Sequence, residues 1–281
     1  MQTLKLTRTA TGRTISLTGP GSYDELSAQQ LVIFMRAKRK EKDPFCQALV
    51  LVKLFFKIPA TYIKKLNKIQ AMQLASLVNF LYEPALKIEK WLISSISTRH
   101  WLKRNFFYGP ADGLENICFA EFFYADDRFS KYQNTNDPVK LNELIGILYR
   151  KKDEVSNQDN TGDIRIPFNK HTIEKNGLQV SGLNEDTKRA ILLNYIGCRT
   201  LLAGYFKNLF PQVKEDEEKT DQPATNGSWL ELAIQLARKE RALGTFSEME
   251  LQNAYLVLKV LDKVIEEAEE MKEEIERLKQ K

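Results

Sequence analysis

Three carboxylates lie close together in the sequence: Glu121, Asp126 and Asp127. Two carboxyl groups held in different environments can perform general acid–base chemistry, in which one gives a proton and the other takes it. The segment from about 118 to 132 has helical apolar spacing, and there Asp127 can pair with Lys131 four residues on. Because the sequence places no nucleophile, base or phosphate-binding loop beside these acids, we expect helix ion pairs and no enzymatic activity.

Histidines and cysteines are too few and too scattered to predict a metal site. The two histidines are His100 and His171, and the three cysteines are Cys46, Cys118 and Cys198, with no C-x-x-C pair. Neither a G-x-x-x-x-G-K-[ST] nor a G-x-G-x-x-G loop occurs. We therefore expect no catalytic, cofactor-binding or metal-binding residues. The odd number of cysteines favours a reducing compartment.

Charge is divided unevenly along the chain. Residues 1–110 carry 18 Lys and Arg against 6 Asp and Glu, a net charge of +12, whereas residues 111–281 have a net charge of −7. The basic run from Arg36 to Lys42, together with Lys64, Lys65 and Lys68, makes nucleic-acid binding one alternative function. The run also coincides with a predicted helix C-terminus, where the helix dipole favours cations.

Hydropathy argues against a membrane protein. The most apolar stretch, Ala48 to Phe56, is interrupted by Lys53 and is far shorter than the ~20 residues that a spanning helix needs. The N-terminus shows no apolar signal sequence. We expect a soluble protein that is not secreted.

Along residues 1–212 the spacing of apolar residues is mainly helical. Residues 1–20 alternate in polarity around a turn and predict a small β-hairpin, and 21–212 predict a multi-helix body. Asp-Pro pairs at 43–44 and 137–138 are typical helix starts, with Asp as the cap and Pro at the first helical position. A further helix is predicted over Tyr23–Lys40, with Ser27 as an alternative, internal start. The polar, glycine-bearing segment at about 151–183 predicts a long loop.

Residues 228–281 are predicted to form a helical arm, separated from the rest of the chain by a linker. Residues 213–227 predict a charged linker, and 228–281 predict two helices that begin at capping boxes at Ser228 and Ser247. The last helix carries an apolar seam with a one-residue slip, formed by Leu258, Leu261, Ile265, Met271, Ile275 and Leu278. The seam either packs along its own protein or binds a partner helix, including that of a second copy. These residues are the candidate partner-binding site.

Three segments resemble a known group of proteins: Phe-Tyr-Gly-Pro-Ala-Asp-Gly at 107–113, Phe-Ala-Glu-Phe at 119–122 and Leu-Leu-Asn-Tyr-Ile-Gly-Cys-Arg at 192–199. They are similar to a family of uncharacterised phage and prophage-like tail-region proteins of Bacteroidetes. The resemblance spans most of residues 26–265. It assigns no role to any single residue, because the family has no motif of known role.

The resemblance implies a non-enzymatic protein of tail assembly, with a chaperone of the tape-measure protein as its specific form. A structural neck or tail adaptor is the alternative, and it differs by remaining in the finished particle. The implied partners are tape-measure or other tail proteins. The implied location is the cytosol of the bacterial host or the phage particle.

Overall fold

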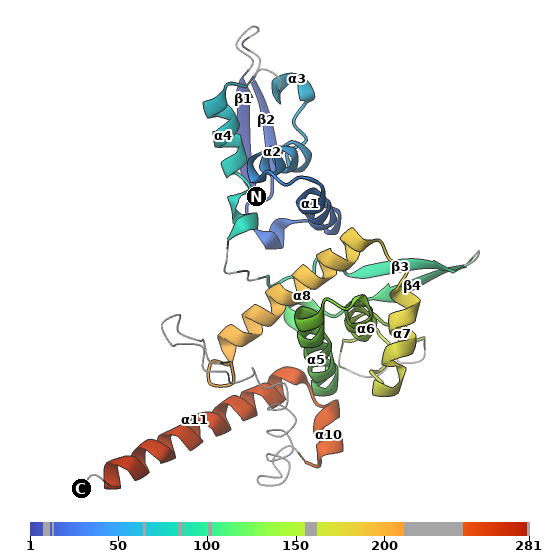
Figure 1. The fold of residues 1–281 in the computed structure, drawn as a ribbon, viewed down its shortest axis with the longest axis vertical. Helices are drawn as coiled ribbons and strands as arrows, with labels where there is room; N and C mark the ends of the chain where they lie inside the picture. The colour runs from blue at the N-terminus through green and yellow to red at the C-terminus, as the bar shows by residue number, and fades with distance from the viewer. Residues whose placement is uncertain are drawn as a thin grey trace. The chain divides into compact units, whose positions relative to one another are not determined.

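The computed structural model describes residues 1–7, 12, 14–63, 66–83, 86, 88–100, 103–154, 162–210 and 244–279. As predicted, the chain is mainly α-helical, with a small N-terminal β-hairpin and a long C-terminal helix (Figure 1). It divides into unit 1, Met1–Ile93 with Asn184–Cys198, and unit 2, Ser94–Leu183 with Arg199–Lys281. These units differ from the predicted division at residues 20, 212 and 227.

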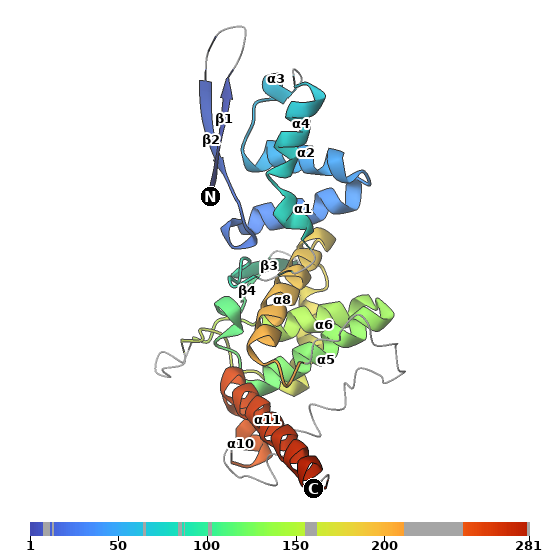
Figure 2. The same cartoon turned by 90° about the vertical axis from the view of Figure 1, so that its left-hand side faces the viewer.

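Unit 1 combines a hairpin with short helices. Strand β1 (Gln2–Thr7) pairs antiparallel with β2 (Thr14–Gly19), and Leu4 lies opposite Leu17. Figure 2 shows the hairpin beside the helices of this unit. These are η1 (Tyr23–Glu25), α1 (Ala28–Lys40), α2 (Pro44–Phe55), α3 (Ala60–Ile63), α4 (Lys68–Ser76), η2 (Asn79–Tyr82) and the first part of α8 (Glu185–Tyr205).

Side-chain caps set where these helices begin. Asp43 accepts hydrogen bonds from the backbone N–H groups of Phe45 and Cys46, which confirms the predicted start of α2. The helix predicted over Tyr23–Lys40 begins at Ala28, which is the alternative start: the Ser27 side chain accepts from the Gln30 N–H and forms a capping box there. Residues before Ser27 form one 3-10 turn.

Unit 2 is built around an antiparallel helix pair, α5 (Phe119–Thr135) and α6 (Pro138–Leu148). Asn136 turns the chain between them with a left-handed φ of 52°. Asp137 caps α6 as predicted, accepting from the Val139 N–H at 2.8 Å. The other elements are β3 (Ser95–His100), β4 (Lys103–Tyr108), η3 (Asp112–Leu114), η4 (Lys170–Thr172), α7 (Ile173–Val180), the end of α8, α10 (Phe246–Leu251) and α11 (Ala254–Lys279).

Unit 2 differs from the prediction in three places. The sequence did not predict the hairpin β3–β4, whose last residue, Tyr108, pairs with Arg150. The loop predicted over 151–183 is wrong in its second half, which forms η4 and α7. The predicted final helix is interrupted at Gln252 and Asn253, because their backbone pairs with residues 117–119 instead of continuing the helix.

Two predicted segments fall within residues 211–243. The charged linker at 213–227 and the helix predicted from Ser228 to about Arg241 lie outside the described residues.

Helices α6 and α7 meet backbone to backbone. A Cβ atom placed on Gly146 would lie 2.5 Å from the backbone nitrogen of Gly177, and one placed on Gly177 would lie 3.2 Å from the Glu143 backbone. Both glycines lie inside helices, where glycine is intrinsically unfavourable. Their presence is explained by the close approach that they allow.

Gly146→Ala should therefore lower the free energy of unfolding by about 1–3 kcal/mol, the usual cost of overpacking. Urea denaturation followed by circular dichroism measures it. Gly204→Ala is the matched control, because Gly204 is also helical but faces open space, so the substitution should be neutral or slightly stabilising. Equal effects of the two substitutions would contradict the role given to the close contact.

Asp186, near the start of α8, gives a second prediction. Hydrogen bonds from Arg39 and then Arg36 lower the pKa of this buried carboxyl to about 2. A carboxyl whose folded pKa lies below its unfolded value, about 3.9, stabilises the fold above that pH and loses the effect as the pH falls toward 2. The stability gap between the wild type and Asp186→Asn should therefore shrink between about pH 4 and pH 2. Urea midpoints at several pH values test this, and a constant gap would contradict it.

Candidate functional site

The three carboxylates that first suggested chemistry belong to different ion pairs. Glu121, on α5, is 1% exposed and accepts hydrogen bonds from Arg165, while Arg150 approaches the same Glu121 oxygen at 2.8 Å. Asp163 completes this cluster, 2.8 Å from the Arg165 side chain. Because two buried guanidinium groups face two carboxylates, the four charges of this cluster balance one another.

Electrostatics in this ion cluster favour the charged forms. Burial alone would lower the pKa of Arg165, but the nearby carboxylates of Glu121 and Asp163 outweigh it, and the pKa is raised. Arg165 also donates to the backbone oxygen of Leu148 at 2.7 Å. The cluster therefore links α5, the end of α6 and the segment around residue 165.

The other two acids, Asp126 and Asp127, pair with different basic residues from those that contact Glu121. Asp126 pairs with Arg199, and the cation of Arg199 also lies over the Phe129 ring. Asp127 pairs with Arg128 and, at 2.9 Å, with Lys131, which confirms the predicted pair four residues apart. Each of the three carboxylates therefore has a basic partner, as expected if these acids form ion pairs.

Part of the basic run is engaged within unit 1. Arg36 and Arg39 both bind Asp186, with nitrogen–oxygen distances of 3.1 and 2.8 Å. Lys64 and Lys65 lie outside the described residues. The nucleic-acid alternative thus loses two arginines that would otherwise be available for phosphates.

Metal-ligating side chains do not gather in the part of the chain that the structure describes, where no group of three His, Cys, Asp or Glu is placed to hold an ion. Cys46 is exposed, Cys118 half-buried and Cys198 buried. Within the same described ranges, no helix has the length and apolar composition needed to cross a membrane.

The first half of α11 is part of the core of unit 2. The side chains of Val257, Leu258 and Leu261 are fully buried. Asp262 accepts hydrogen bonds from the backbone N–H groups of residues 208 and 209, both at 2.9 Å, and the Tyr255 hydroxyl donates to the Gly113 oxygen at 2.7 Å. These contacts fix the base of the helix, which also packs against α5.

The second half of α11 has no such cover. Every residue from Glu266 to Lys279 is exposed, and among them Met271, Ile275 and Leu278 are 62%, 50% and 65% exposed. The predicted partner-binding residues are therefore divided. Leu258 and Leu261 pack within their own protein, Ile265 is half-buried at the boundary, and the last three present an apolar stripe.

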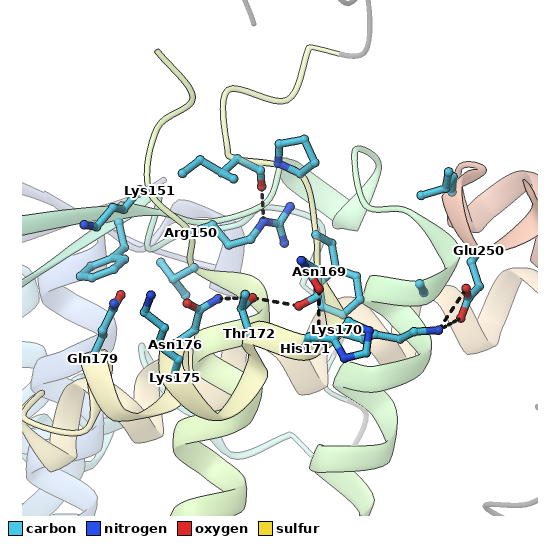
Figure 3. Close-up of a pocket in the computed structure, with 17 residues that line it drawn as sticks. Arg150, Lys151, Asn169, Lys170, His171, Thr172, Lys175, Asn176, Gln179 and Glu250 are labelled. Carbon is cyan, nitrogen blue, oxygen red and sulfur yellow. Dashed lines mark hydrogen bonds and ion pairs between the residues drawn. The ribbon is translucent and has the colours of Figure 1, made fainter. Parts of the chain in front are cut away.

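A cavity of about 560 Å³ lies elsewhere in unit 2 (Figure 3). Its walls come from α7 and η4, the segment Tyr149–Lys151, the segment Ile166–Phe168 and α10. Figure 3 shows Lys170 reaching toward Glu250, at 3.3 Å, while Arg150 donates to the Ile166 oxygen at 2.7 Å. Asn169 caps η4 by accepting from the His171 N–H at 2.9 Å. The cavity has the size of a small-molecule site.

Sequence reasoning did not find this cavity. Its lining residues are spread from position 107 to position 251, and most belong to the segment read as a loop. One signal was available, because Lys175, Asn176 and Gln179 recur at helical spacing and share one face of α7. This spacing indicates a shared face only if residues 173–180 form a helix, and the sequence had predicted a loop there.

Comparison with known proteins gives no further lead: no family model matches the chain, and no curated protein or solved structure shows significant similarity.

Glu121→Gln should lower the free energy of unfolding by about 3–5 kcal/mol, because it leaves the buried guanidinium groups with too little negative charge. Asp127→Asn, on the same helix but in a more accessible pair, should cost at most about 1 kcal/mol. Urea denaturation of both variants measures the difference. Similar small losses in both would show that the ion cluster does not stabilise unit 2.

Proposed function

We propose that this chain is a non-enzymatic assembly or interaction protein of phage or phage-like tails, which binds a helical partner along the exposed half of α11. The tape-measure protein is the expected partner, and the chain would act as its chaperone. The single observation that supports the proposal most is the exposed stripe of Met271, Ile275 and Leu278 on a helix whose base is fixed in unit 2.

The spacing of the stripe suits a helical partner. The steps from 271 to 275 and from 275 to 278 are four and three residues, so these side chains lie on one face and can pack into the grooves of another helix. The exposed part, Glu266 to Lys279, extends about 20 Å at 1.5 Å per residue. That length allows about two heptads of contact.

Charge further defines the partner. Seven glutamates against three lysines and arginines give the segment 266–279 a net charge of −4. A partner helix with an apolar stripe flanked by Lys or Arg would meet complementary charge, which favours encounter and specificity. The ion pairs within the helix, Lys263 with Glu267 and Arg277 with Glu273, are exposed and contribute little to its own stability.

Replacing Met271, Ile275 and Leu278 together by Gln should abolish capture of the tape-measure protein from the same phage region, while leaving the fold intact. Gln keeps helix propensity but removes the apolar contact. Co-expression followed by affinity purification and isothermal titration measures the loss.

The matched control replaces Lys272 and Glu276 by Gln, which leaves the net charge of the helix unchanged and alters residues outside the stripe. This variant should bind as the wild type does. Retained capture by the triple variant, or failure of the intact chain to bind the tape-measure protein, would refute the proposed function.

A further inference from the structure

We propose that the cavity of unit 2 binds a phosphorylated small molecule of nucleotide size. This site is separate from the exposed half of α11 and does not depend on the proposed tail function. The volume of the cavity, the charges around it and the hydrogen-bond donors that its own protein leaves available all fit such a ligand.

Positive charge dominates the wall of the cavity. Arg150, Lys151, Lys170 and Lys175 line it, and Glu250 is the one carboxylate among the lining residues. Because Glu121 and Asp163 balance the charge of Arg150, and Glu250 balances that of Lys170, the positive charge left for a ligand is that of Lys151 and Lys175. A concave surface lined by one sign of charge concentrates its field on the space that it encloses. The cavity is therefore suited to an anion.

The cations differ in what they can offer to a ligand. Arg150 is 6% exposed, and its guanidinium already donates to the backbone oxygens of Ile147 and Ile166 and faces carboxylates, so its charge is balanced and few of its donors are free. Lys170 is held by Glu250. By contrast, Lys151 and Lys175 are exposed and have no carboxylate partner in the part of the chain that the structure describes.

The available donors match a phosphate group. Lysine ammonium groups bind phosphate as compact point charges, and the amide side chains of Asn176 and Gln179 lie on the same face of α7 as Lys175 (Figure 3). The Asn176 amide gives one N–H to the Thr172 hydroxyl at 3.3 Å and keeps its second for a ligand. Lys151 lines the cavity from the segment 149–151, after the end of α6. Because the guanidinium of Arg150 is occupied, a bidentate clamp for a carboxylate is not offered here.

The size and the apolar part of the wall indicate a ligand larger than phosphate itself. The volume of about 560 Å³ lies in the range of small-molecule sites and far exceeds that of one phosphate ion. Ile166, Pro167, Phe168 and Leu251 supply apolar surface for an organic group such as a base. Phe168 is half-buried, so part of its surface is open to contact.

Replacing Glu250 tests whether the ligand is an anion, because the direction of the change in affinity depends on the charge of the ligand. Its carboxylate repels an anion and also holds Lys170. Glu250→Gln should therefore release the Lys170 ammonium, raise the positive charge of the cavity and tighten binding. A site that binds cations or neutral molecules would respond in the opposite way or not at all.

The experiment titrates the full chain with ATP in a calorimeter, and separately with inorganic phosphate and with adenosine. ATP should bind, with phosphate and adenosine each much weaker. Lys151→Gln and Lys175→Gln should each weaken ATP binding by about tenfold, as expected for the loss of one charge-assisted hydrogen bond. Glu250→Gln should strengthen it several-fold.

Lys152→Gln is the control, since Lys152 is exposed and adjacent to Lys151 but does not line the cavity. It should leave ATP binding unchanged, and circular dichroism should show that all four variants are folded. Absence of ATP binding at millimolar concentration, an equal effect of Lys152→Gln, binding of adenosine as tight as that of ATP, or weaker binding by Glu250→Gln would each overturn the proposal. Tighter binding of a single-stranded oligonucleotide than of ATP would overturn it in favour of a nucleic-acid surface.

Discussion

The buried pairing of Glu121 and Asp163 with Arg150 and Arg165 is the interaction on which unit 2 depends. Four charged groups leave water together, and each would be costly alone. The cluster joins α5 to the end of α6 and to a segment that has little regular structure of its own. Backbone hydrogen bonds pair residues 164–166 with residues 151–153, and the cluster adds the side-chain link from this segment to the helix pair.

This cluster also shapes the cavity. Arg150 is drawn inward by Glu121 and by the backbone oxygens of Ile147 and Ile166, so its side chain forms part of the wall and does not extend into solvent. The backbone of the same residue pairs with Tyr108 at the end of β4. One residue thus connects the hairpin, the ion cluster and the cavity.

Local rules predicted much of the helical part and little of what depends on distant contacts. The Asp-Pro starts at 43–44 and 137–138 were correct because the cap and the proline act within one turn. The break before α11 was missed, because Asn253 pairs with residues far away in the sequence. The hairpin β3–β4 was missed because its polar strands lack a clear apolar alternation.

The candidate sites show the same limit. Helical spacing identified the apolar residues of α11, but it could not tell that Leu258 would be buried and Leu278 exposed, since this depends on where unit 2 ends along the helix. The acids Glu121, Asp126 and Asp127 were grouped by position, whereas their partners Arg165, Arg199 and Lys131 separate them in space. The cavity required knowledge of tertiary structure from the start.

The contact between Gly146 and Gly177 has a consequence for recognition. Helix α7 carries one wall of the cavity, and at Gly146 and Gly177 its backbone rests directly on that of α6, with no side chain between them at that point. Such a wall has few alternative positions, so a ligand would lose little free energy in ordering it. The affinity of this cavity would then depend mainly on the rotamers that the lysine side chains adopt around the ligand. The backbone of α7 that carries Lys175 would stay in place.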